Sequence, residues 1–312
     1  MPKSNMDKPQ HFFILGAAKC GTSSLYHYLN QHSEIYLPDV KEPLFFEKEF
    51  NRGAEYYWNT NFSSWNGEKM VGEARHRNLY LPYVPERIAS TFPNARLLVV
   101  VRNPVDRAFS HYNHRRVRGL EKSTFEEAIQ LDMERIERGE FIHAEDEIRL
   151  YIQNLRPDGS SFHSTIIDSG YYAEQVKRYL KFFDRKQLLI VFLDDLKKDP
   201  KRCYFEILRF LDKRLSLIEI DFSVRNKRVN RTYQKVHNYF SNHRNFSRII
   251  KPLKTQRAKS IFLNLTKYFD NGFLEGKQSM RSETRLFLIS HYLEHNKALE
   301  RLTGRDLSHW NK

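Results

Sequence analysis

Three continuous apolar runs divide the chain, and each is followed by glycine or by polar residues. They are the segments 12–15, 96–101 and 187–193. Apolar side chains at consecutive positions are typical of strands buried on both faces of a parallel sheet. Stretches with helical periodicity separate the runs. The pattern therefore predicts a parallel sheet that is covered by helices on both faces.

Apolar residues recur at helical spacing in the intervening segments. A helix is expected to begin close after the first run and to include 25–29. Four further helices are expected over 124–136, 172–183, 200–211 and 286–302. Ser123 and Glu126 have the spacing of a capping box at the start of one of them, and Gly304 closes the last. The predicted fold class is α/β, with a central parallel sheet flanked by helices in three layers.

Composition narrows the kinds of partner that the chain is expected to meet. Its 312 residues carry a formal net charge of +14, from 52 lysines and arginines against 38 aspartates and glutamates. This excess favours a polyanion such as nucleic acid, anionic lipid, a sulfated sugar or a nucleotide, or else a basic surface that aids solubility. Aromatic residues make up 14% of the chain, which excludes disorder as a description of the whole.

Cysteines and apolar segments bear on where the protein works. Cys20 and Cys203 are too few for a disulfide framework or a metal cluster. The polar N-terminus lacks the apolar centre of a signal peptide, and no apolar run approaches the ~18–20 residues that cross a bilayer. We therefore expect a cytoplasmic protein without a membrane span.

The segment 12–29 combines a predicted strand, a glycine-bearing loop and a helix start. Gly16, Lys19 and Gly21 lie between the apolar run and three consecutive hydroxyl residues at 22–24. The first N–H groups of a helix lack internal partners and carry partial positive charge. Glycines let such a backbone close on an anion, while a lysine and hydroxyls supply further donors. The segment predicts a P-loop-like phosphate site, although an ordinary strand–turn–helix connection has the same outline.

The spacing differs from that of a Walker loop. Gly16 and Gly21 are separated as in that motif, but Thr22 stands where the motif requires lysine, and Lys19 lies inside the loop. A nucleoside triphosphatase would lose both its lysine position and the hydroxyl that binds Mg²⁺. We therefore expect an anion site that needs no metal.

A second candidate anion site follows the second apolar run. Arg102 stands at the end of that run and Ser110 one helical stretch later, so the two could hold a phosphate by charge-assisted hydrogen bonds. Ligands of open α/β sheets bind beyond the carboxyl ends of the strands. The alternative is that Arg102 pairs with Asp106 at the start of a helix. Two anion sites after two neighbouring strands suit a nucleoside with phosphates at both ends.

A third candidate is the segment Lys41-Glu42-Pro43, which precedes an apolar Leu-Phe-Phe run. A carboxylate beside a lysine and a proline could sit in a rigid loop that faces the phosphate site. The alternative is a charged turn residue before a buried pair of phenylalanines.

Taken in order, these motifs resemble the sulfotransferases that depend on 3′-phosphoadenosine 5′-phosphosulfate (PAPS), in particular their heparan-sulfate-type and bacterial branch. The resemblance extends from about residue 12 to residue 310. It rests on the segments 16–24, 41–43, 72–74, 102–112, 170–172 and 293–310. Several motifs in the same order are far more specific than any one of them.

The resemblance implies roles for the matched positions. The 5′-phosphosulfate would be held by Lys19, Cys20, Gly21, Thr22, Ser23 and Ser24. Arg102 and Ser110 would hold the 3′-phosphate. Glu42 matches the catalytic base of the heparan-sulfate-type enzymes, and Lys19 would stabilise charge on the leaving oxygen. The histidine base of the cytosolic hormone- and phenol-sulfating branch has no clear match here.

The chain also departs from this family pattern. After 72–74, relatives often carry small hydroxyl residues, whereas this chain has Arg75, His76 and Arg77. With Lys41, these three are candidate acceptor-binding residues, and the alternative is an exposed basic turn. The C-terminal basic loop of the heparan-type enzymes is bracketed by cysteines, and here Lys227 and Arg228 occupy a similar place without them. Both are candidate contacts to the nucleotide.

We expect one sulfotransferase domain over 1–312, with a nucleotide-binding core at 10–220 and a basic segment with C-terminal helices at 221–312. The stretch 140–168 is either a substrate-facing insertion or a long surface loop. For 223–260 the pattern favours no particular secondary structure. The reaction implied by the resemblance moves a sulfuryl group from PAPS to a hydroxyl or amine of a saccharide or small hydroxylated metabolite.

Two other functions are compatible with parts of the sequence. A nucleotide kinase or other phosphotransferase would use the glycine-bearing loop, but the position of Lys19 argues against it. A nucleic-acid-binding protein would suit the charge of +14, but its basic and aromatic residues should then form one stripe.

Overall fold

The centre of the molecule is a parallel sheet of five strands. The computed structural model describes residues 9–117, 120–141, 165–223 and 279–312. The strands lie in the order β2-β3-β1-β4-β5, and all neighbouring pairs are parallel. Their bounds are β1 Gln10–Gly16, β2 Ile35–Tyr36, β3 Met70–Ala74, β4 Arg96–Val101 and β5 Leu188–Phe192. The parallel sheet is therefore confirmed, and β1, β4 and β5 coincide with the three predicted runs.

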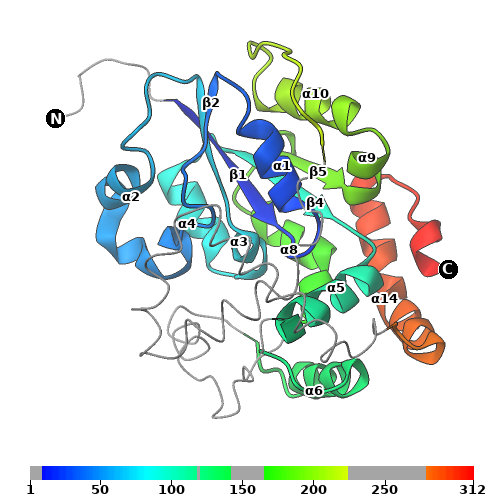
Figure 1. The fold of residues 1–312 in the computed structure, drawn as a ribbon. Helices are drawn as coiled ribbons and strands as arrows, with labels where there is room; N and C mark the ends of the chain where they lie inside the picture. Colours follow the sequence, from blue (N-terminus) through cyan, green and yellow to red (C-terminus); the bar gives the residue numbers. More distant parts are fainter. Residues whose placement is uncertain (1–8, 118–119, 142–164, 224–278) are drawn as a thin grey trace, which may run out of the picture.

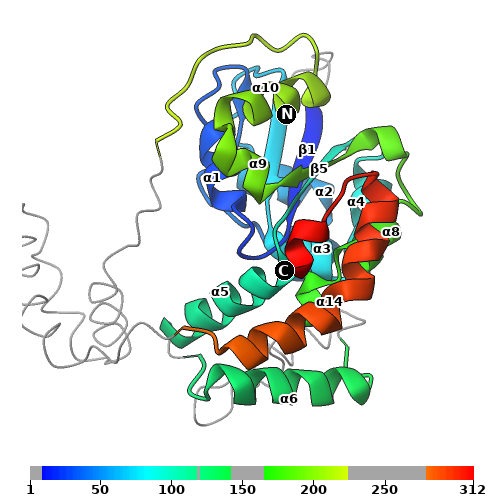
Figure 2. The same ribbon diagram turned by 90° about the vertical axis from the view of Figure 1, so that its right-hand side faces the viewer.

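Helices cover both faces of this sheet, which gives the three layers that the sequence predicts. Figure 2 shows α1, α9 and α10 on one side of the sheet and α3, α4 and α8 on the other. The first group spans α1 Thr22–Leu29, α9 Leu193–Lys198 and α10 Pro200–Leu211. The second spans α3 His76–Tyr80, α4 Val84–Thr91 and α8 Tyr172–Tyr179. The fold is thus the expected P-loop-like α/β fold.

The remaining elements lie at the edges of this sandwich. They are α2 Gly53–Asn61, α5 Pro104–Val117, α6 Phe125–Glu137 and α14 Ser282–Thr303, with short turns η1 Phe45–Glu49, η2 Phe50–Arg52, η3 Asp168–Gly170, η4 Arg185–Gln187 and η5 Ser308–Asn311. Figure 1 shows α5, α6 and α14 gathered below the sheet, near the end toward which β1 points. Among the described residues, no helix is long and apolar enough to cross a membrane.

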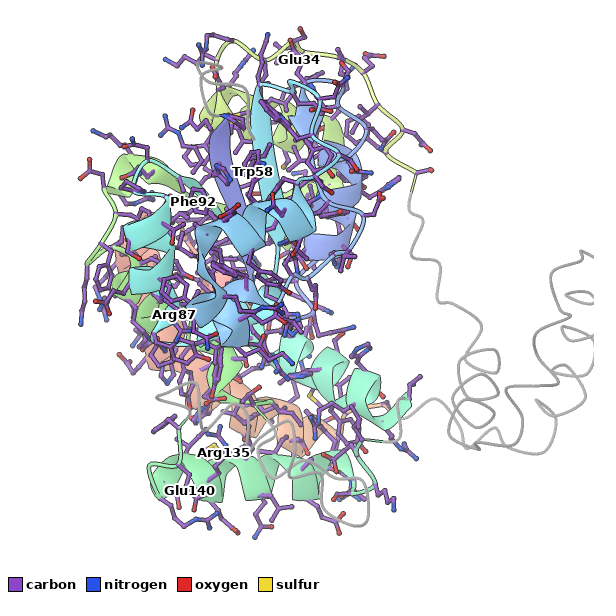
Figure 3. The ribbon with its side chains drawn as sticks, turned by 90° about the vertical axis from the view of Figure 1, so that its left-hand side faces the viewer. Glu34, Trp58, Arg87, Phe92, Arg135 and Glu140 are labelled. Carbon is purple, nitrogen blue, oxygen red and sulfur yellow. The ribbon has the colours of Figure 1, made fainter. Side chains whose placement is uncertain are left out.

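Two apolar clusters hold these layers together. The larger one surrounds β1, β3 and β4, whose side chains are almost entirely buried. At its edge the ring of His11 stacks on Phe92 at 3.8 Å and lies 5.8 Å from Trp58; Figure 3 shows Trp58 and Phe92 close to β1. Burial lowers the pKa of His11 to about 3, although a hydrogen bond with the backbone of Pro9 opposes the shift.

The smaller cluster lies between α5, α6 and α14. Phe125 of α6 and Leu288 of α14 meet Tyr112 of α5 there. Arg135 of α6, seen at the lower edge in Figure 3, bonds Asp132 at 2.8 Å and Asp168 at 2.8 Å. The C-terminal helix thus packs against α5 and α8. The division of the chain at residue 220 stays a prediction.

Several predicted helix bounds differ from those observed. The capping box of α6 is formed by Thr124 and Glu127, one residue later than predicted. The first helical residue is Phe125, so Thr124 is the N-cap, and its N–H donates to the Glu127 carboxylate at 2.7 Å. Helix α8 ends at Tyr179, and α14 already begins at Ser282. Most of 140–168 and 223–260 lies outside the described residues.

Candidate functional site

The loop between β1 and α1 has the backbone of a tight anion cradle. Gly16 and Gly21 have φ angles of 146° and 96°, in the region that favours glycine, and Lys19 has a φ of 67°. A Cβ on Gly21 would lie 2.6 Å from Cδ1 of Leu193. The carbonyl of Gly21 accepts the N–H of Ser24 at 3.0 Å. The N–H groups before Ser24 therefore precede the first helical hydrogen bond and lie where an anion would bind.

The predicted cofactor-binding residues of this loop differ in what they expose. Cys20 is fully buried, and its Sγ lies 3.6 Å from the hydroxyl of Tyr172. Burial raises the pKa of the Cys20 thiol, although Arg107 and Tyr172 oppose the shift. Thr22 is buried, whereas Ser23 is exposed and Ser24 partly so. The side chain of Cys20 therefore packs into the protein interior, whereas Ser23 and Ser24 are accessible to solvent.

The second predicted anion site begins at the end of β4, beside β1 in the sheet. Arg102 is followed by α5, whose start is capped by Asn103 Oδ1 through the N–H of Val105 at 3.0 Å. The Arg102 side chain is partly exposed and lies 3.9 Å from Asp106, which also binds Arg285 at 3.0 Å. The pairing of Arg102 with Asp106 that the sequence allowed is thus present only as a long contact. Both candidate anion sites lie at the carboxyl edge of adjacent parallel strands.

The segment with Lys41 and Glu42 lies directly against the loop. Lys41 Nζ donates to Ser23 Oγ at 2.6 Å. Glu42 has a φ of 73° and a side chain that is 29% exposed. The structure therefore joins the first and third motifs into one site.

Both carboxylate oxygens of Glu42 have nitrogen partners. Nδ1 of His76 lies 3.0 Å from Oε1, and Nη1 of Arg75 donates to Oε2 at 3.2 Å. Burial alone would raise the pKa of Glu42. The hydrogen bond from His76 and the charges of His76, Arg75 and Lys41 outweigh burial and lower this pKa to about 2. Glu42 is thus held as a carboxylate.

A buried carboxylate that the sequence reasoning missed holds the two arginines. Glu47 of η1 is fully buried and accepts from Nε of Arg75 at 2.7 Å and from Nη1 of Arg77 at 2.9 Å. Arg87 of α4 donates to the carbonyl of Phe46 at 2.9 Å, which fixes this turn (Figure 3 labels Arg87). The alternative of an exposed basic turn is therefore wrong for Arg75. A single carboxylate directly after two phenylalanines was the available signal for Glu47.

Two further titratable groups near the site were also given no role from sequence. Glu73 of β3 is buried and accepts from the hydroxyl of Tyr57 at 2.7 Å and from Nδ2 of Asn78 at 3.1 Å. Burial outweighs these bonds and raises the pKa of Glu73 to about 7. On α5, burial and the charges of nearby cations, His76 among them, hold the pKa of His111 well below its usual range. His111 therefore stays neutral beside the site.

Ser110 lies partly exposed on α5, next to His111. The predicted nucleotide contacts Lys227 and Arg228 lie outside the described residues. Their roles, like those of the other candidate site residues, stay predictions.

Comparisons with known proteins indicate the family of this chain. A model of the sulfotransferase domain matches residues 9–275. The membrane-associated sulfotransferase kil1 of Dictyostelium discoideum is 25% identical over 263 residues, which are 65% of this chain and 56% of that protein. The bifunctional heparan sulfate N-deacetylase/N-sulfotransferase 4 of Mus musculus is 24% identical over 319 residues, 96% of this chain and 31% of that protein. The chain thus spans about half and about a third of the length of these relatives.

A solved structure is similar over nearly the whole length. The crystal structure of a sulfotransferase from Alicyclobacillus acidocaldarius has a TM-score of 0.67 and 27% sequence identity, and the match covers 98% of this chain and all of that one. The family match extends over most of the chain, including the loop at 16–24 and the segments of Glu42, His76 and Arg102. The chain belongs to the sulfotransferase domain family.

Proposed function

We propose that this chain transfers a sulfuryl group from PAPS to a hydroxyl or amine of an acceptor, which is a saccharide or a small hydroxylated metabolite. The observation that carries the proposal is the meeting of three motifs at one edge of the sheet. The loop at 16–24 and the start of α5 follow adjacent strands, and the hydrogen bond from Lys41 to Ser23 brings Glu42 to the loop. The family match supports the reaction class.

The donor set fits the two ends of PAPS. In this proposal, Lys19, the first N–H groups of α1, Ser23 and Ser24 hold the 5′-phosphosulfate. Arg102 and Ser110 hold the 3′-phosphate through a guanidinium and a hydroxyl. Lys227 and Arg228 would contribute from outside the described residues. When bound, PAPS supplies the sulfuryl group and departs as adenosine 3′,5′-bisphosphate.

The chain's own residues then supply positioning and charge. Lys19 stabilises negative charge on the oxygen that leaves sulfur. His76 and Arg75 hold the carboxylate of Glu42 ionised. Its negative charge favours removal of the proton from the acceptor's hydroxyl or amine. Two fixed phosphate sites hold the donor in line with the acceptor, which removes much of the entropic part of the barrier. No residue in this proposal requires a metal.

The acceptor class is proposed from the relatives. The mouse relative is named as acting on heparan sulfate, so saccharides form the first acceptor panel and small hydroxylated compounds the second. Incubation of the full chain with PAPS labelled in its sulfuryl group, followed by mass analysis of each acceptor, identifies the product. The absence of label transfer to every acceptor, together with no release of bisphosphate, would refute the proposed reaction.

A binding experiment separates this proposal from its two rivals. Adenosine 3′,5′-bisphosphate should raise the melting temperature without Mg²⁺, and a hundredfold excess over its dissociation constant corresponds to about 2.7 kcal/mol. ATP and single-stranded DNA should shift it far less. A shift with ATP that depends on Mg²⁺ would instead favour a phosphotransferase, and a shift with DNA alone would favour a nucleic-acid-binding protein.

A further inference from the structure

The hydrogen bonds of Glu42 leave its carboxylate poorly placed to take a proton from an acceptor. His76 engages one oxygen at 3.0 Å and Arg75 the other at 3.2 Å. Arg75 is itself anchored on the buried Glu47, so it cannot easily turn away. Although burial opposes the shift, the hydrogen bond from His76 and the charge of Arg75 lower the pKa of Glu42, which makes it a weaker base than an ordinary carboxylate.

The same hydrogen bond determines which nitrogen of His76 can accept a proton. An ionised carboxylate only accepts hydrogen bonds, so Nδ1 of His76 must carry the hydrogen that points at Glu42. In the neutral imidazole, Nε2 then has the lone pair. Within the described part of the chain, the imidazole has its hydrogen bond to Glu42 and no other. The His76 side chain is 32% exposed, which leaves Nε2 accessible to an acceptor.

His76 also lies at the point where the site's elements meet. Its backbone oxygen is so close to the phosphate loop that a Cβ on Gly16 would approach it to 2.7 Å. Lys41 Nζ donates to Ser23 Oγ of the same loop and lies 4.0 Å from Oε1 of Glu42, the oxygen that contacts His76. His111 of α5 is near enough for the charge of His76 to affect it. The imidazole is therefore connected to Ser23 of the phosphate loop through Glu42 and Lys41.

The groups that face the imidazole come from three elements. Glu42 and Lys41 approach from the segment before η1, Arg75 is the residue before His76 in the sequence, and His111 approaches from α5. Glu42 supplies the negative charge in contact with the ring. His111 is neutral because burial and neighbouring arginines lower its pKa. An imidazolium at position 76 would therefore form directly beside its compensating carboxylate.

We propose that Nε2 of His76 is the atom that accepts the acceptor's proton and that Glu42 orients its ring. This inference rests on the proposed sulfotransferase function and assigns its proton transfer. The acceptor O–H or N–H bond breaks and its proton moves to Nε2, while the acceptor atom forms a bond to sulfur. The bond between sulfur and the phosphate oxygen of PAPS breaks, and its electron pair stays on the departing bisphosphate. The imidazolium later returns its proton to water, and Glu42 remains ionised throughout.

The first test is a pair of variants in single-turnover sulfation, with PAPS and de-N-sulfated heparan sulfate as the acceptor probe. His76→Asn keeps an amide N–H that can still bond Glu42 but has no basic nitrogen. We expect its rate to fall by about 10²–10⁴-fold, the usual contribution of a general base, with bisphosphate affinity within about twofold of the parent. The matched control is His309→Asn, since His309 is 51% exposed in η5, and its rate should be unchanged.

Chemical rescue distinguishes the two candidate bases. Free imidazole should restore sulfation in His76→Ala, because it can occupy the vacated position and accept the proton. Formate should not restore His76→Ala, because Glu42 already supplies a carboxylate in that variant and a carboxylate is not the base here. Rescue of His76→Ala by formate to the level reached with imidazole, or a His76→Asn variant that keeps more than about a tenth of the rate, would overturn the proposal.

A spectroscopic measurement decides the geometry without donor or acceptor. Nitrogen-15 shifts of the His76 ring in the full chain should show the hydrogen on Nδ1 in the parent protein. They should show loss of that preference in Glu42→Ala. A hydrogen on Nε2 in the neutral parent would overturn the assignment. If the parent binds no bisphosphate, the proposed function fails separately, and the ring shifts still decide whether Glu42 orients His76.

Discussion

Replacing Glu47 by glutamine tests whether this buried carboxylate holds the basic segment in place. The Glu47 side chain is fully buried and accepts hydrogen bonds from Arg75 and Arg77. Glutamine keeps the size and one oxygen acceptor but removes the charge and turns an N–H₂ group toward guanidinium donors. Arg75 would then be a buried cation that has lost its main partner.

The expected cost follows from the exposure of the two arginines. Breaking a buried ion pair typically costs about 3–5 kcal/mol, because the remaining charge is left uncompensated. Arg75 keeps its bond to Glu42 at 3.2 Å, and the Arg77 side chain is 26% exposed and can turn to water. We therefore expect Glu47→Gln to lower the free energy of unfolding by about 3 kcal/mol, the lower end of that range.

Urea unfolding followed by circular dichroism measures this change as a shift in the midpoint at constant m value. Glu55→Gln is the matched control, because Glu55 is exposed in α2 and the same substitution there should change the free energy of unfolding by less than about 0.5 kcal/mol. In folded protein the variant should also sulfate more slowly, because Arg75 keeps its bond to Glu42 but is no longer anchored by a charged partner at position 47. A destabilisation no larger than that of the control would show that Glu47 does not anchor the two guanidinium groups.

Three further changes have defined outcomes. The pKa of Glu73 is about 7 in the folded protein against an ordinary 4.5, so between these pH values the folded state binds a proton that the unfolded state does not. As pH rises from 4.5 to 7, the free energy of unfolding should therefore fall by roughly 3 kcal/mol relative to that of Glu73→Gln. A difference between the two proteins that does not change with pH in urea titrations would contradict this. Arg102→Ala and Ser110→Ala should each weaken adenosine 3′,5′-bisphosphate binding by roughly 1–3 kcal/mol in calorimetry but leave adenosine 5′-phosphosulfate unaffected; equal losses for both ligands would remove the 3′-phosphate assignment. Gly21→Ala should lower stability by about 1–2 kcal/mol, because a Cβ at a φ of 96° would meet Leu193 at 2.6 Å; an unchanged melting temperature would show that the loop relaxes freely.

The sequence predicts the sheet where its strands are uniformly apolar. β1 and β4 are buried on both faces along nearly their whole length. Consecutive side chains in these strands are therefore apolar, and the sequence shows a continuous apolar run. β3 is equally buried but was missed, because its five residues include Gly72 and Glu73. The ring of Phe12 lies 2.3 Å from where a Cβ on Gly72 would be, so only glycine fits there. Hydrogen bonds from Tyr57 and Asn78 make the buried carboxylate tolerable.

The meeting of the motifs could also be predicted, because the carboxyl ends of parallel strands share one edge. The strand order β3-β1-β4 places the segments that follow each strand side by side. These segments carry His76, the loop at 16–24 and Arg102. What the pattern could not supply is the partner of each side chain. Glu47 reaches Arg75 only because η1 turns its carboxylate into the protein, and no periodicity in the sequence indicates that turn.

In the structure the arginines of the segment 75–77 are paired with carboxylates instead of lying free in solvent. A basic run usually lies in solvent, and as such it would attract an acidic acceptor. Here Arg75 and Arg77 bind Glu47, Arg75 also binds Glu42, and the two guanidinium groups and two carboxylates together carry no net charge. These four side chains therefore give no electrostatic reason to prefer an acidic acceptor. Their combined effect is to hold a carboxylate against one nitrogen of His76, which is the arrangement that the proposed proton transfer requires.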